Sequence, residues 1–279
     1  MSKKVEYDKL ELKELNYDSY LKVGELLELQ QEVSDPPHHD EMFFIIIHQA
    51  SELWFKEILH ETKILKLAFR EQKISKVLKA LRRIVAIMDL LVKQIAMIST
   101  LTPVEFAGFR DKLTPASGFQ SSQFRIIEYT YGIRNPFFIK FFQSVPETFS
   151  HLSKIQKEPS VYDDCLYCLK EMGYDIPDEI INRDFSQDRE MNDGVIEILK
   201  NIYENPQNNF HLVLLFETML DFDEKMKQWR STHVTAVSRT IGMKKGTGGS
   251  SGFDFLQQRI FYHFFPELWE VRNCFKDQK

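Results

Sequence analysis

The chain has 279 residues, of which 43% are hydrophobic and 28% are charged, as in an ordinary soluble globular protein with a sizeable core. Its formal net charge of -5 comes from 36 basic and 41 acidic residues, and the basic residues are scattered along the predicted helices. This distribution argues against a nucleic-acid groove and against binding to an anionic membrane surface.

The amino terminus and the apolar runs predict a cytoplasmic protein. The first residues, MSKKVEYDKLELKEL, are too polar for a signal peptide. No apolar run approaches the ~18 residues that a membrane-spanning helix needs. We therefore expect neither secretion nor insertion into a membrane.

The three cysteines, Cys165, Cys168 and Cys274, are an odd and small number, which argues against a disulfide framework in a chain of this size. Cys165 and Cys168 have the spacing of a redox or metal motif. However, the second Cys or His pair of a zinc site is missing, and no histidine follows for covalent haem attachment. A structural role is therefore the favoured interpretation.

Helical periodicity dominates the chain, because glycine is scarce and the prolines fall in a few clusters. The predicted helices are 19–31, 41–72, 74–100, 103–113, 120–131, 136–151, 161–172, 193–204, 210–241 and 253–274. The sequence therefore predicts an all-α protein.

The first predicted helix is separated from the others by the rigid sequence Ser-Asp-Pro-Pro at 34–37. Residues 1–35 are therefore interpreted as an arm that packs on a neighbouring subunit, and 36–279 as one helical domain. Within that domain, residues 157–192 are more polar and are interrupted by prolines. We interpret them as a helical excursion, called here the excursion segment, rather than as a second domain.

A buried histidine is predicted in the long helix 210–241. Residues recur there at alternating spacings of four and three along one helical face: Leu215, Met219, Phe222, Met226, Trp229, His233 and Val237. His233 therefore lies on the buried face. The pattern alone also fits a core histidine that is hydrogen-bonded to a backbone carbonyl.

A second histidine, His48, shares a face of the helix 41–72 with Phe44, Ser51 and Phe55. Two helices thus each direct one histidine inward. A closed zinc site needs about four ligands, which this pattern does not supply. Single histidines on two helices suit the two faces of a haem, one on the iron and one over the open coordination position.

A di-iron site is an alternative, because Glu57-x-x-His60 is the Glu-x-x-His element of di-iron carboxylate bundles. That fold requires a second copy of the element, and the chain contains none. His60 is therefore expected at a helix surface.

Two further features suggest ligand contacts. Phe106 and Arg110 lie four residues apart on one helical face, so Arg110 is a candidate carboxylate clamp; a surface arginine in a weak ion pair is the alternative. The glycine-serine loop at 246–252 lacks the lysine of a phosphate-binding loop and does not follow a strand. It is either a plain linker or a loop that closes over a ligand and offers the Thr247 hydroxyl.

Five separated blocks of the chain together form a specific pattern. They are Tyr17-x-x-Tyr20-Leu21, HDEMFFIIIHQASELWFKEI from His39, FAGFRDKLTPASGFQSSQFRIIE from Phe106, WRSTHVTAVSRTIGMKKGTGGSSG from Trp229 and FFPELWEVR from Phe264. In this order, the blocks resemble the tryptophan 2,3-dioxygenase family. The resemblance runs from about Tyr17 to Arg272, and the excursion segment carries little of it.

The resemblance implies an all-helical homotetramer with one non-covalent haem b per subunit, ferrous in the active form. It implies an oxidoreductase that inserts both atoms of O2 across the indole C2–C3 bond of L-tryptophan. The product is N-formyl-L-kynurenine, which is the first step of tryptophan catabolism by the kynurenine pathway. L-tryptophan and O2 are thus the expected partners, with neither nucleic acid nor membrane.

The resemblance also implies roles for individual residues. By position, His233 matches the proximal ligand of the haem iron, and His48 matches the catalytic distal histidine beside the indole nitrogen. Arg110 matches the residue that binds the substrate carboxylate. The remaining matches are Phe44 and Phe106 in the walls of the indole pocket, Thr247 near the substrate ammonium, Ser117 and Gly118 at the haem edge, and Tyr17, Tyr20 and Leu21 in an arm that completes the substrate pocket of a neighbouring subunit.

Two other classes of protein stay open from the residues themselves. A haem-binding sensor or carrier would keep His233 without needing the arrangement of His48, Arg110 and Thr247. It would bind haem and leave tryptophan unchanged. A helical scaffold would use these residues for packing and would purify colourless.

Overall fold

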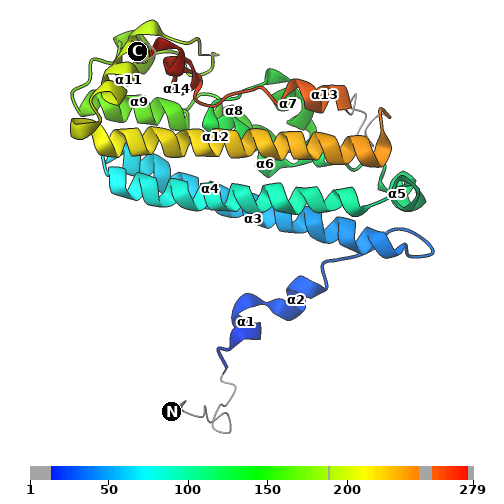
Figure 1. Ribbon diagram of the computed structural model, residues 1–279. Helices are drawn as coiled ribbons and strands as arrows, with labels where there is room; N and C mark the ends of the chain where they lie inside the picture. Colours follow the sequence, from blue (N-terminus) through cyan, green and yellow to red (C-terminus); the bar gives the residue numbers. More distant parts are fainter. Residues whose placement is uncertain (1–13, 188, 245–252, 276–279) are drawn as a thin grey trace, which may run out of the picture.

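Three long helices form the centre of the molecule: α3 (His39–Arg70), α4 (Ile74–Ala96) and α12 (Pro206–Ile241). The computed structural model describes residues 14–187, 189–244 and 253–275, and every regular element in these ranges is helical. Helix α4 lies between α3 and α12 and packs against both (Figure 1). The predicted all-α fold is confirmed.

Shorter helices surround this centre. They are α5 (Pro103–Arg110), α6 (Ser122–Tyr131), α7 (Pro136–Phe141), α8 (Pro146–Ile155), α9 (Val161–Glu171), α10 (Asp178–Ile181), α11 (Asp193–Glu204), α13 (Phe253–Gln258) and α14 (Pro266–Glu270), with 3-10 turns at η1 (Met97–Thr100), η2 (Asp111–Leu113), η3 (Gly118–Gln120), η4 (Phe142–Ser144) and η5 (Val271–Cys274). No single described helix has the length and apolar composition needed to cross a membrane. Only a pair bent by 91°, Ile74–Thr100 with Pro103–Leu113, would have them if taken together.

The apolar stripe of α12 is buried as the spacing predicts. Leu215, Met219, Phe222 and Met226 are at most 1% exposed, and Trp229 is 9% exposed. Burial of each such side chain stabilises the fold by about 1.5–3 kcal/mol. The stripe therefore anchors α12 against the core as far as Trp229, while His233 and Val237 at its far end are only partly buried.

Several predicted helices are interrupted, and the predictions of continuous helices were wrong there. The helix predicted at 136–151 breaks at Val145, which has φ -120° and ψ 85°. The cause is Pro146, whose ring disfavours helical geometry at the preceding residue. The helix predicted at 253–274 likewise resumes only at Pro266, and the one at 19–31 divides at Lys22, which has φ 56°.

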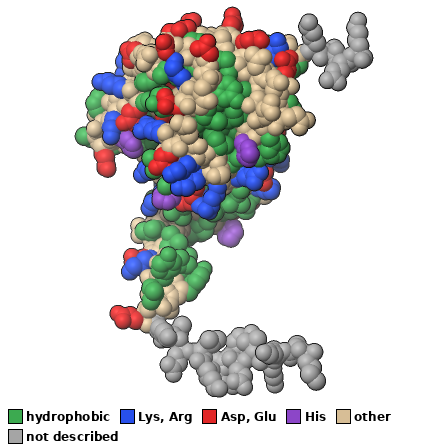
Figure 2. All heavy atoms as spheres, turned by 90° about the vertical axis from the view of Figure 1, so that its left-hand side faces the viewer, with side chains coloured by type: hydrophobic (Ala, Val, Ile, Leu, Met, Phe, Trp, Pro, Cys, Tyr) green, Lys and Arg blue, Asp and Glu red, His purple; other side chains and the backbone are tan. Residues whose placement is uncertain are grey.

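The amino-terminal arm contains α1 (Tyr17–Leu21) and α2 (Val23–Leu27), and neither helix has a buried residue. It projects away from the three long helices (Figure 1). Figure 2 shows hydrophobic side chains over much of its described surface. Its described, exposed large apolar residues are Leu15, Tyr17, Tyr20, Leu21, Leu26, Leu27, Leu29 and Val33. Packing of this arm on a neighbouring subunit stays a prediction.

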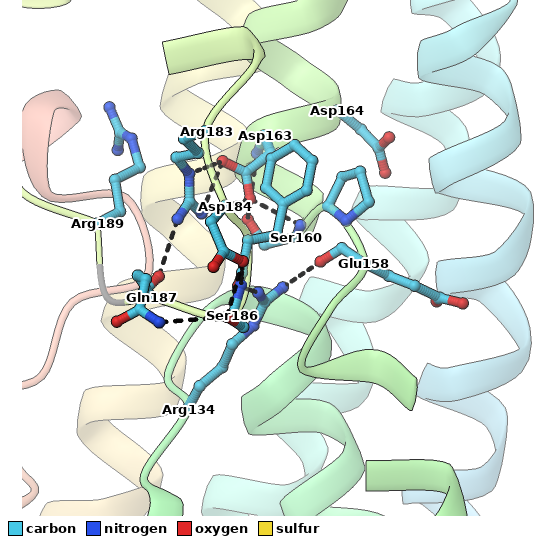
Figure 3. A network of polar contacts seen from close by, with 12 residues as sticks. Arg134, Glu158, Ser160, Asp163, Asp164, Arg183, Asp184, Ser186, Gln187 and Arg189 are labelled. Carbon is cyan, nitrogen blue, oxygen red and sulfur yellow. Dashed lines mark hydrogen bonds and ion pairs between the residues drawn. The ribbon is translucent and has the colours of Figure 1, made fainter. Parts of the chain in front are cut away.

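Polar contacts hold the excursion segment against the rest of the helical domain (Figure 3). Arg134 donates to the backbone carbonyl oxygens of Glu158, at 2.5 Å, and of Phe185. Within the segment, both oxygens of the buried Asp163 carboxylate accept from Arg183 Nη2, at 3.1 and 3.0 Å. Helix α9 also packs against α3. These contacts tie the segment to the same body as the long helices.

Candidate functional site

Two imidazoles from distant parts of the chain belong to the candidate site, on helices that contact each other through Phe55 and Trp229. His48 lies on α3 and His233 on α12. Burial, and secondarily the nearby His48, lowers the pKa of His233 to about 4. Burial also lowers the pKa of His48, against smaller opposing effects of the Phe44 carbonyl and the Glu52 carboxylate. Both rings are therefore neutral near pH 7.

The tautomer of His48 follows from its hydrogen bond. Its Nδ1 lies 2.7 Å from the carbonyl oxygen of Phe44, one helical turn earlier. A carbonyl oxygen only accepts, so Nδ1 carries the proton and Nε2 keeps its lone pair. His48 can thus accept one hydrogen bond at Nε2.

An aromatic wall stands beside His48. The Phe44 ring lies 4.2 Å from the His48 ring, and the Phe106 ring lies 5.6 Å from that of Phe44, between centroids. Phe109 completes the wall, fully buried and edge-on to Phe106 at 5.3 Å. Analysis of the sequence alone missed Phe109. Beside it, a Cβ added at Gly108 would lie 2.7 Å from the His38 ring, so a larger residue there would force that ring to shift.

A second aromatic group backs His233. The Trp229 ring, one turn earlier on α12, lies 5.7 Å from the His233 ring. Phe124 of α6 lies 4.9 Å from Trp229, and Phe55 of α3 lies edge-on to it at 6.1 Å. Within the described ranges, neither ring nitrogen of His233 makes a hydrogen bond. This contrasts with His48 and disfavours the interpretation of His233 as a core histidine bonded to a carbonyl.

A cavity of about 470 Å³ opens between α5 and the carboxyl end of α12. Phe106 lines it, so the cavity adjoins the aromatic wall beside His48. Arg110, Arg239 and Lys244 also line it, and the only acidic residue among its described lining residues is Asp111. The excess of positive charge suits an anionic group such as a carboxylate. The predicted contact Thr247 and the loop 246–252 lie outside the described residues.

The other predicted site residues among those described lie in the turn η3 and on the amino-terminal arm. Ser117 caps the turn η3, where its Oγ accepts from the backbone N–H of Phe119 at 3.4 Å, and Gly118 is exposed in the same turn. Tyr17 and Tyr20 are 77% and 72% exposed on the arm, and Leu21 beside them is 45% exposed. The structure of a single chain therefore does not bring the arm residues to the histidine pair.

The described residues also bear on the kind of metal centre. His60 is exposed, as expected for a helix surface. No group of three or more His, Cys, Asp or Glu side chains that could hold a metal ion occurs in the described ranges, so the di-iron alternative has no support there. Haem iron needs only one protein ligand. His233, a neutral imidazole that makes no hydrogen bond to the described residues and is backed by aromatic rings, fits that requirement.

Comparison with known proteins decides the family. The sequence model described as tryptophan 2,3-dioxygenase matches residues 1–154 and 190–275. This chain belongs to the tryptophan 2,3-dioxygenase family. It is 42% identical to the tryptophan 2,3-dioxygenase of Arthrobacter sp. (strain FB24) and 41% identical to that of Rhodococcus jostii (strain RHA1), in each case over 93% of this chain and 91% of the relative. It is 43% identical to the enzyme of Herpetosiphon aurantiacus, over 92% of this chain and 97% of the relative.

Membership in the tryptophan 2,3-dioxygenase family confirms the resemblance and the expected enzyme class, an oxidoreductase of tryptophan catabolism. Enzymes of this family depend on haem. The family match leaves out residues 155–189, which make up most of the excursion segment. The residues matched include both histidines, Arg110 and the two phenylalanines of the predicted pocket.

Proposed function

We propose that this chain opens the indole ring of L-tryptophan with O2, to give N-formyl-L-kynurenine, at a haem b bound by His233. The observation that carries the proposal is a pair of neutral imidazoles, His48 and His233, on two helices that pack ring against ring. One has its Nδ1 bonded to a carbonyl, and the other has no hydrogen bond among the described residues. This difference suits a distal and a proximal histidine.

His233 would hold the haem, one per subunit. Its depressed pKa keeps the imidazole neutral, so a nitrogen lone pair is available to iron across the physiological range. When bound, ferrous haem supplies the binding and activation of O2. The rings of Trp229 and Phe124 exclude water behind the ligand, and Ser117 and Gly118 would contact the haem edge.

The substrate would be held by its two ends. Arg110, in the cavity beside Phe106, would bind the carboxylate of tryptophan in a charge-assisted contact. Thr247 would contact the ammonium group. Phe44 and Phe106 would flank the indole ring and orient it. This set selects an α-amino acid with a flat apolar side chain.

His48 would accept a hydrogen bond from the indole N–H at Nε2, since Nδ1 is engaged by the carbonyl of Phe44. Indole N–H is so weakly acidic that its full deprotonation by an imidazole is energetically poor. The role of His48 is therefore to steer the indole ring and hold its proton in place.

His48→Ala is expected to keep haem and to lower turnover by about 10-fold, the value of one hydrogen bond. Haem absorbance and steady-state kinetics with L-tryptophan would measure both. A fall of about 100-fold or more with normal substrate affinity would instead indicate an obligatory general base.

Arg110→Ala is expected to raise the KM for L-tryptophan by roughly 10- to 100-fold, because the carboxylate loses a contact of about 1.5–3 kcal/mol. Binding of indole, which has no carboxylate, should change by less than about 3-fold. Titration of both ligands followed by the haem absorption band gives the two affinities. Equal losses for the two ligands would reject the carboxylate clamp.

The assembly would be a homotetramer in which the arm of one subunit completes the pocket of another. Tyr17, Tyr20 and Leu21 are exposed on the arm, and such apolar exposure is typical of an interaction surface. On α3, Ile46 and Leu53 are also about half exposed, seven residues apart on one face. Both surfaces would be covered by other copies of the chain.

The decisive experiment mixes purified, haem-loaded, reduced protein with L-tryptophan and ¹⁸O2. N-formyl-L-kynurenine that carries two labelled oxygen atoms, identified by absorbance and mass, is the expected product. Haem binding with tryptophan unchanged would favour a sensor or carrier. A protein that binds no haem would first contradict the assignment of His233 as the haem ligand.

A further inference from the structure

A buried carboxylate at the start of α3 binds the segment that leads to the arm. Glu41 is 1% exposed, and one of its oxygens accepts from the backbone N–H of Val33 at 2.7 Å. The other oxygen accepts from the backbone N–H of Ser34 at 3.0 Å and from the Ser34 hydroxyl. All three donors therefore belong to two residues just before the proline pair.

A second set of hydrogen bonds between α3 and this segment lies two turns further along the helix. Gln49 Nε2 donates to the backbone carbonyl of Leu29 at 2.9 Å, and its Oε1 accepts from Gln30 Nε2 at 2.6 Å. Gln49 directly follows His48. The segment 29–34, called here the strap, is thus held at both ends by the helix that carries Phe44 and His48.

Beyond the strap, few contacts with other described residues hold the arm in position. Helices α1 and α2 have no buried residue, and neither makes an extensive contact with any other described helix. The arm leaves the body at the strap and runs outward (Figure 1). Its direction therefore depends on the strap.

We propose that Glu41 and Gln49 are positioning residues, which clamp the strap to α3 and so set where the arm's Tyr17 and Tyr20 meet a second copy of this chain. The proposal rests on the proposed function, in which the arm completes a neighbouring pocket. Because the helix that holds the strap also carries His48, the same contacts connect each subunit's own site with the arm that it contributes to its neighbour.

The chemistry makes Glu41 the stronger clamp. A carboxylate accepts on both oxygens, and hydrogen bonds to a charged group are about twice as strong as neutral ones. Glu41→Gln keeps the side-chain volume but replaces one carboxylate oxygen with an NH2 group. That group is a donor and would face the N–H and O–H donors of the strap. Gln49→Ala removes the second clamp and leaves Glu41 intact. Glu147→Gln, an exposed acid in the first turn of α8, is the matched control.

The test combines amide hydrogen exchange of the haem-loaded tetramer with kinetics. Glu41→Gln is expected to exchange the amides of Val33 and Ser34 at least about 10-fold faster, because their acceptor is lost. The KM for tryptophan should rise about 5- to 10-fold with kcat nearly unchanged, since the arm orders substrate and takes no part in the chemistry. Gln49→Ala should show the same changes to a smaller extent, and the control should show none.

Mixed oligomers then test where the arm acts. Subunits with Glu41→Gln keep an intact pocket, and subunits with Arg110→Ala keep an intact strap and arm. Co-expression of the two with different affinity tags yields oligomers that contain both. Pockets of the Glu41→Gln subunits should recover the lower KM, because a neighbour now lends a correctly placed arm.

The possible outcomes separate the two proposals. Unchanged exchange in the strap of both variants would overturn the clamp. Faster exchange with an unchanged KM would uphold the clamp and reject the role of the arm in a neighbouring pocket. A raised KM that mixing does not lower would show that the strap acts only on its own subunit, which also rejects positioning toward a second copy.

Discussion

His233→Ala is expected to yield a folded protein that lacks the haem absorption band and forms N-formyl-L-kynurenine only at background level. His233 is the one imidazole of the histidine pair whose nitrogens make no hydrogen bond among the described residues, so its replacement would remove the proposed iron ligand without breaking a hydrogen bond there. Replacing a residue that only hydrogen-bonds to a metal ligand lowers metal affinity or activity by about 10- to 100-fold. Replacing the ligand itself should therefore lower activity by more than about 100-fold.

The matched control for this variant is His60→Ala, because His60 is an exposed histidine on α3. It should keep both the haem band and the activity. Absorption spectra and haem titration of the two purified proteins make the comparison. An unchanged haem spectrum in His233→Ala would remove the ligand assignment and leave His48 as the next candidate.

Glu128→Ala should cost about 3–5 kcal/mol of the free energy of unfolding, because it leaves buried guanidinium groups without their shared carboxylate. Glu128 is fully buried on α6. Its oxygens lie 2.5 Å from Arg125 Nη1, 3.2 Å from Arg230 Nη2 and 3.1 Å from Arg259 Nη2. Although burial opposes it, the effect of these three arginines lowers the pKa of Glu128 and keeps the carboxylate ionised.

Glu217→Ala is the control for Glu128→Ala. Glu217 pairs with Arg272 at 2.6 Å, but its side chain is 50% exposed. An exposed pair contributes about 0–1 kcal/mol, so this variant should unfold nearly as the parent does. Urea unfolding of both variants measures the difference. Equal stability of the two variants would mean that the arginines find other partners once Glu128 is gone.

The two site histidines could be predicted from the sequence because helical burial has a local signature. The spacing from Leu215 to Trp229 places His233 on the inner face of α12, and Phe44 and Phe55 do the same for His48 on α3. The motif blocks then assigned Arg110 and Thr247 to a pocket. The structure places Arg110 in a cavity with Phe106, and Thr247 lies outside the described residues.

Other features of the site could not be predicted in this way. In the sequence, Phe109 and Phe124 look like ordinary apolar residues. In the structure, Phe109 packs against Phe106, and Phe124 packs against Trp229. The clamp on the strap was also not visible, because Glu41 in the first turn of a helix is usually a solvated acid that favours the helix dipole. Its burial depends on how the chain before α3 folds back.

The all-α class, most helix positions and the helix face that carries each histidine could be predicted from the local sequence. These depend on hydrogen bonds and side-chain spacings within four residues, which the local sequence specifies. The packing of α3 and α12, which contact each other through Phe55 and Trp229, is tertiary information that puts His48 and His233 in one region of the molecule. The tertiary structure likewise decided that Glu128 gathers three arginines and that Glu41 holds the strap, since such contacts join residues that no local rule connects.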